Sequence, residues 1–169
     1  MHSFTGFLLA ILLIVLPVYA VEPADERRLD EVAERGVHVM PFDLEKTVHV
    51  FSKTADGGIQ QVIAKDKADT EQIQLIREHL LEISEAFSQG DFSSPEHIHG
   101  ESMPGLAVLK TAKPEQLKIE YSELPDGAQI IYSAQQSRFV TAIHHWFDAQ
   151  LSDHARHAVP GHTHKHKHH

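Results

Sequence analysis

The sequence predicts an α+β fold in which two strand-strand-helix repeats form a four-stranded antiparallel sheet with helices packed on one face. Two Asp-Gly turns, at residues 56–57 and 126–127, each separate two short runs rich in β-branched residues. A stretch with helical periodicity follows each hairpin. Because one hairpin alone cannot bury its apolar side, we expect the two units to join in one sheet beneath the helices.

The first twenty residues predict a signal peptide. Residues 4–21 carry no charged side chain, residues 7–16 are wholly apolar, and Val18-Tyr19-Ala20 suits cleavage after Ala20. The alternative is an uncleaved anchor, although the stretch is near the short end for a membrane-spanning helix. Cleavage predicts a periplasmic or secreted protein. Residues 21–40 are mostly charged and predict a short solvated helix or linker that ends near Gly36.

The domain expected over residues 41–158 begins with a hairpin and a helix. Residues 47–53 and 59–63 have strand character on either side of the first turn. In the helix that follows, Asp69 or Thr70 is the N-cap, and Gly90 ends the apolar periodicity.

The second half repeats this order after a long connection. Residues 91–115 predict a loop with one helical turn at residues 106–110, and loops of this length are often functional. Strands at residues 117–121 and 128–132 flank the second turn, and a helix is expected over residues 137–157. Residues 159–169 predict a disordered, histidine-rich tail.

The composition points to imidazole chemistry. The chain has 169 residues, no cysteine, 15 histidines, and a formal charge of −9 from 24 acidic and 15 basic side chains. The lack of cysteine excludes disulfide scaffolds, cysteine zinc sites and thiol catalysis. The acidic balance argues against nucleic acid as a partner, and against a membrane once the signal peptide is removed, since both require clustered Lys and Arg. A metal ion is the expected partner.

Three histidines are predicted to face the core. In the second helix, His154 and His157 share the apolar stripe at an i, i+3 spacing that suits chelation, whereas His144 and His145 lie off it and are expected at the surface. The repeat assigns His49 to a core-facing strand position. A buried imidazole requires a partner, which is a carbonyl, a carboxylate or a metal ion. Structural and ligand roles both remain open.

The connection over residues 91–115 adds further donors. An extended chain places His97 and His99 on one side, and Met103 follows four residues later. Imidazole with thioether suits copper, particularly Cu(I), whereas imidazole with the carboxylates of Asp153 or Glu101 suits zinc or nickel. We expect one set of donors to meet on the helix-covered side of the sheet, namely His49, His97, His99, His154 and Met103.

The tail is a second metal-binding element. It has no apolar residue after Gly161, and such a segment binds Cu(II), Ni(II) or Zn(II) whatever its purpose. It is either an expression tag or a native metal-collecting segment, and the interleaved Thr163, Lys165 and Lys167 favour the native segment. The expected tail ligands are His162, His164, His166, His168 and His169.

Several segments resemble a known group of proteins. They read TVHVF at residues 47–51, GDF at 90–92, HIHG at 97–100, MPGL at 103–106 and HHWFDAQLSDH at 144–154. They are similar to short exported bacterial proteins that carry the name aspartate carbamoyltransferase, and the likeness covers about residues 41–158. The resemblance implies export and a His-rich end, but no ligand set. Carbamoyl transfer is not expected, because this chain lacks the Ser-Thr-Arg-Thr loop that would hold carbamoyl phosphate.

Three functions fit these observations. The leading one is a periplasmic copper-, nickel- or zinc-binding protein with an internal site and a metal-collecting tail. The second is a haem or other tetrapyrrole binder, with His49 or His154 as axial ligand beside Trp146. The third is a metal-assisted hydrolase with Asp153 as its base. Enzyme activity is less expected, because the chain has no nucleophile elbow, Gly-rich phosphate loop or His-Glu-x-x-His helix.

Overall fold

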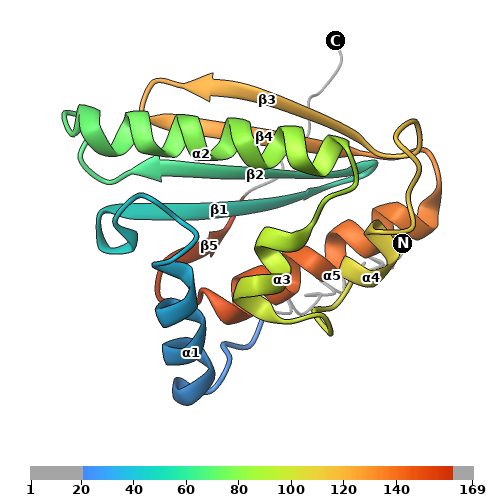
Figure 1. Cartoon of the computed structure of the whole chain (residues 1–169), viewed down its shortest axis with the longest axis horizontal. Helices are drawn as coiled ribbons and strands as arrows, with labels where there is room; N and C mark the ends of the chain where they lie inside the picture. The colour runs from blue at the N-terminus through green and yellow to red at the C-terminus, as the bar shows by residue number, and fades with distance from the viewer. Residues whose placement is uncertain (1–20, 162–169) are drawn as a thin grey trace, which may run out of the picture.

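The computed structural model describes residues 21–161, in which helices pack against one β-sheet as the predicted α+β class requires (Figure 1). The signal peptide expected over residues 1–20 and the tail histidines of residues 162–169 lie outside the described residues.

Both predicted hairpins form at the Asp-Gly turns, and the second strand of each pairs antiparallel with the other at the centre of the sheet. In the first strand Thr47, His49 and Phe51 are buried, while the residues between them are half-buried. The strand therefore directs alternate side chains toward the helices. The four hairpin strands are β1 (Thr47–Thr54), β2 (Gly57–Ala64), β3 (Lys118–Leu124) and β4 (Gly127–Ser133).

The sheet has five strands and is mixed, which differs from the four antiparallel strands that the sequence predicts. Its order is β3-β4-β2-β1-β5, and β5 (Ala158–Pro160) runs parallel to β1. The His49 amide donates to the His157 carbonyl at 2.8 Å, and the Gly161 amide donates to the Phe51 carbonyl at 2.9 Å. A three-residue strand shows no alternation to detect in the sequence, and its proline suits a sheet edge because it has no N–H to donate.

Two long helices cover the same face of the sheet. α2 (Thr70–Ser88) packs mainly on β3 and β4, and α5 (Ser137–Asp153) packs on β2 and β1. Asp69 is the N-cap of α2, because its carboxylate accepts a hydrogen bond from the Gln72 amide. Side chains from both helices join those of the strands in one continuous apolar core.

α5 ends at Asp153, earlier than the predicted end at His157. His154 is the C-cap, and the His157 amide donates to the His154 carbonyl at 2.8 Å within a turn. The prediction that His154 and His157 form an i, i+3 pair on one helix is therefore wrong. The physical reason is that the pairing of β5 with β1 requires the chain to change direction directly after the helix.

The segment 91–115 contains two short helices, where the sequence predicts a loop with one helical turn. The first is α3 (Ser93–His99), and the second, α4 (Leu106–Leu109), coincides with the predicted turn. Buried Pro95 and Ile98 attach α3 to the core, and Gly100, at a φ of +87°, ends it. Seven residues are too few to show a helical period, which is why this element escapes detection.

The charged N-terminal segment folds onto the domain. α1 (Glu26–Gly36) begins at the N-cap Asp25 and buries Leu29 and Val32, and the 3-10 helix η1 (Leu44–Lys46) leads into β1. The segment is therefore a packed helix with one exposed face. Among the described residues, no helix has both the length and the apolar character needed to cross a membrane.

Candidate functional site

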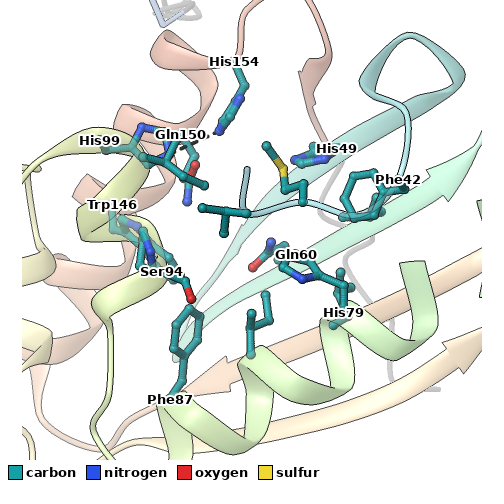
Figure 2. A pocket seen from close by; sticks show the side chains of 17 residues that line it. Phe42, His49, Gln60, His79, Phe87, Ser94, His99, Trp146, Gln150 and His154 are labelled. Carbon is teal, nitrogen blue, oxygen red and sulfur yellow. Dashed lines mark hydrogen bonds between the residues drawn. The ribbon is translucent and has the colours of Figure 1, made fainter. Parts of the chain in front are cut away.

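A cavity of about 50 Å³ lies between the helices and the sheet, and four imidazoles from four parts of the chain line it. They are His49 of β1, His79 of α2, His99 of α3 and His154 directly after α5. Figure 2 shows His154 between His99 and His49, with His79 on α2 at the opposite end of the cavity from His154. The other lining residues are mostly apolar or aromatic, so nitrogen donors are the main polar chemistry of this space.

The closest pair is His99 and His154, whose Nε2 atoms lie 3.2 Å apart. Behind it, His99 Nδ1 lies 2.7 Å from Asp153 Oδ2. Arg28 holds the same carboxylate with two donors, at 3.1 Å from Nε and 2.5 Å from the terminal nitrogen. Arg28 also donates to the His99 carbonyl at 2.9 Å. The result is a chain of polar contacts that runs from α1 to the cavity.

The protonation states along this chain follow from burial and charge. Burial opposes ionisation of Asp153, but its hydrogen bonds with His99 and Arg28 outweigh burial and lower its pKa to about 2. The ionised carboxylate only accepts, so His99 Nδ1 carries the proton. Burial lowers the pKa of His99, which keeps the ring neutral and leaves a lone pair on Nε2. Burial also lowers the pKa of His154 well below its usual value, and this ring donates from Nε2.

His49 faces the same cavity without a partner for its Nε2 atom. The residue is 5% exposed, and its ring centre lies 5.5 Å from that of His154. Burial, followed by the neighbouring imidazoles, lowers its pKa to about 3. A buried polar atom without a hydrogen bond costs about 1 to 3 kcal/mol. Both His49 Nε2 and Trp146 Nε1 are in this condition, so the wall contains two unused polar atoms.

His79 is a lining residue that the sequence predictions missed. It is half-buried, its ring packs edge-on against Phe42 with centres 5.6 Å apart, and burial lowers its pKa to about 4. Its spacing from Ile76 and Leu80 on the helix is the signal that places it beside the core. Met40 also lines the cavity, but it lies between α1 and η1, where no periodicity exists to find it.

The structure brings some of the expected ligands together and separates others. His49, His99 and His154 share the cavity. His97 is exposed, because it lies on the outer face of α3 and not in an extended segment. Met103 is 4% exposed in the core but does not line the cavity. The prediction that His97 and Met103 lie with the other donors is therefore wrong.

His157 occupies a separate, smaller pocket. Its Nδ1 atom is buried and unpaired, and its Nε2 atom lies 3.4 Å from Glu45 Oε1. Glu101, the expected carboxylate donor of the connection, is exposed. The expected tail ligands His162, His164, His166, His168 and His169 lie outside the described residues.

The two histidines expected at the surface of α5 differ from each other. His145 is exposed, as predicted. His144 is half-buried, and its Nε2 atom lies 3.0 Å from the Thr54 carbonyl and 2.9 Å from the Gly57 carbonyl. It therefore fastens α5 to the turn between β1 and β2, which the helical period alone does not reveal.

The donors in their present positions form a pair and not a larger group. Across residues 21–161, no three histidine, aspartate or glutamate side chains are arranged to hold a metal ion together. No protein-family model, curated protein or solved structure matches the chain. The resemblance to the exported bacterial group therefore stays a prediction.

Proposed function

We propose that this protein binds one transition-metal ion in the cavity, with His99 and His154 as its first two ligands. The observation that carries the proposal is the 3.2 Å separation of their Nε2 atoms. Two nitrogens bonded to one tetrahedral ion at ~2.0 Å each lie ~3.3 Å apart, so the pair already has the spacing of a chelate. Binding replaces the hydrogen bond between the rings with two metal bonds, once the His154 proton moves to Nδ1.

The contacts behind His99 support this role. Metal-bound histidines commonly donate their other ring N–H to a carboxylate, which fixes the tautomer and makes the ligand nitrogen more basic. Asp153 accepts from His99 Nδ1 in this way, and Arg28 holds the carboxylate in place. A purely structural histidine requires only one acceptor, whereas this arrangement also directs the Nε2 lone pair of His99 toward His154 at the cavity.

His49 is the third ligand in this proposal. The ring centres of neighbouring pairs lie 4.9 Å apart for His99 and His154, and 5.5 Å apart for His154 and His49. Imidazoles that share one tetrahedral ion have centres ~5 Å apart when each metal–nitrogen bond is ~2.0 Å. A side-chain rotation that turns the unpaired Nε2 of His49 toward the pair completes the site and gives that atom a partner.

The alternatives fit the cavity less well. A haem requires a pocket in the range of ~300 to 1,000 Å³, and this cavity is about 50 Å³. A hydrolase requires a carboxylate base, but Asp153 bonds to both His99 and Arg28 and has a pKa of about 2. In the proposed role, the signal peptide exports the chain, and the histidine-rich tail gathers ions outside the cytoplasm.

The test compares two histidines of the same helix. The protein is the full chain with its five tail histidines changed to Asn, so that only the domain binds ions. After equilibrium dialysis against copper, nickel or zinc, elemental analysis should find one retained ion per chain in His97→Gln. The His99→Gln variant should retain none, because it lacks a ligand. A full equivalent retained by folded His99→Gln would show that the proposal is wrong.

A further inference from the structure

We infer that the ion bound at this site is Cu(I), and that the thioether of Met40 is a further ligand. This inference rests on the proposed function. Three properties of the cavity carry it, namely the charge of its surroundings, its volume, and the sulfur atom in its wall.

The surroundings of the cavity do not compensate a double positive charge. A histidine that binds a metal ion through a ring nitrogen does so as neutral imidazole, so His49, His99 and His154 bring no negative charge to the site. The one carboxylate in contact with them, Asp153, is balanced by Arg28. The cost of moving an ion out of water rises with the square of its charge, so a dication costs about four times as much as a monocation of equal radius. The site therefore favours the ion of lower charge.

A second guanidinium strengthens this preference. Arg35 is a second cation near His99, and one of its terminal nitrogens is buried without a hydrogen-bond partner. Glu31 lies 3.8 Å from Arg35 and is half exposed to solvent, which weakens its compensation. The local field is therefore neutral to positive, which disfavours Zn(II) and Ni(II) more than Cu(I).

The volume of the cavity requires a dehydrated ion. One water requires ~10 to 15 Å³ of such cavity volume, so six waters of hydration require ~60 to 90 Å³ and do not fit in a cavity of about 50 Å³. Zn(II) and Ni(II) hold their waters strongly because of their double charge. Cu(I) holds water weakly and prefers soft or imidazole ligands, so it loses its hydration shell at the lowest cost.

In this proposal the thioether sulfur comes from Met40, whereas the sequence predicts that it comes from Met103. It is 6% exposed, and it is the only methionine among the residues that line the cavity. Its amide donates to the Gly36 carbonyl at 2.8 Å, which fixes the backbone just after α1. The unbranched side chain then has the rotational freedom to bring its sulfur to the histidines. Thioether with imidazole is a donor set that selects Cu(I) over Zn(II).

The test compares two buried methionines. In the full chain with Asn at the five tail histidines, Cu(I) kept reduced by ascorbate under argon competes against bathocuproine disulfonate. Zn(II) is titrated in parallel against a chromophoric chelator. Met40→Leu should weaken Cu(I) binding about tenfold or more while leaving Zn(II) binding unchanged, because it removes only the soft donor. Met103→Leu, in the same core but outside the cavity, should leave both unchanged. X-ray absorption should show a copper–sulfur path that Met40→Leu loses.

The outcomes separate the two proposals. Equal Cu(I) affinity in the Met40 and Met103 variants, or tighter binding of Zn(II) than of Cu(I), overturns the Cu(I) inference. If His99→Gln still abolishes binding in either case, the metal-binding function stands. If His99→Gln changes the binding of neither ion, both proposals are wrong.

Discussion

The orientation of His99 depends on one carboxylate. Asp153 accepts from its Nδ1 atom and from Arg28, which lies on a different helix, so the ring cannot turn without breaking a charge-assisted contact. The other carboxylate on α5, Asp148, has no such position, because it pairs with Lys53 at the surface. The two aspartates therefore provide a matched comparison on one helix.

Asp153→Asn should lower the affinity of the site for its ion about 10- to 100-fold, the usual effect of losing an acceptor behind a histidine ligand. It should also lower the free energy of unfolding by about 1 to 2 kcal/mol, because a partly buried charge-assisted hydrogen bond is weakened. Asp148→Asn should change neither quantity. Metal competition and urea unfolding measure the two effects, and equal affinities in the two variants would contradict the orienting role.

His49 makes the folded protein sensitive to acid. Burial, then the neighbouring imidazoles of His79, His157 and His99, lower its pKa from 6.5 to about 3. Between these values the unfolded chain binds a proton that the folded chain does not bind. The contribution to stability is therefore complete above pH ~6.5 and is lost progressively as the pH falls toward ~3.

His49→Phe should make the loss of stability between pH 6.5 and 4.5 less steep, by up to about 1.4 kcal/mol per pH unit. The larger ring has room, because the cavity adjoins it and Phe42 and Phe51 already pack around it. His145→Gln, at an exposed position of α5, should keep the original slope. Urea unfolding at several pH values measures both slopes, and parallel curves for the wild type and His49→Phe would refute the assignment.

The elements that the sequence predicted are those that carry their own pattern. The hairpins have Asp-Gly turns and alternating strands, and α2 has a cap and a long apolar period. α3 and β5 are too short to show a helical or strand pattern in the sequence. A helix as short as α3 is unstable alone and depends on tertiary contacts, such as that of Ile98 with the core. The site residues likewise differ in whether a sequence pattern reveals them. His49 follows from strand alternation, whereas the position of His99 depends on the undetected α3.

α4 is held against α5 at Gly105, where the two helices approach closely. Gly105 has a φ of +81°, and a Cβ atom there would lie 2.1 Å from the Ala142 carbonyl oxygen and 2.9 Å from the Trp146 amide nitrogen. Neither backbone atom can move without distorting α5. Gly100 has a similar φ of +87°, but a Cβ atom there would meet nothing within 4 Å.

Gly105→Ala should therefore lower the free energy of unfolding by about 3 kcal/mol or more, because it combines a strained backbone with a collision. Gly100→Ala should cost less, because it adds only the strain of a backbone at φ +87° and ψ +162°, about 1 to 3 kcal/mol. Chemical denaturation measures both values. Equal costs in the two variants would mean that α4 is not held by this contact.

The molecule concentrates its packing on one side of the sheet. Side chains that point away from the helices, such as Val48, Val50 and Ile59, are only half-buried. The opposite side contains the continuous core, and the imidazole cavity lies within it. Trp146, the one tryptophan of the chain, is 1% exposed in the cavity wall. Its emission therefore reports on the integrity of the core and the site together.

An ion held in this cavity should stabilise the whole domain, because its ligands come together only when β1, α3 and the end of α5 are packed. Free ion at 100 times its dissociation constant adds about 2.7 kcal/mol. For a chain of this size, that raises the midpoint of thermal unfolding by about 5 to 10 °C. Tryptophan emission should show this shift in His97→Gln and no shift in His99→Gln, although both retain the tail histidines. A shift of equal size in both variants would place the stabilising ion outside the cavity.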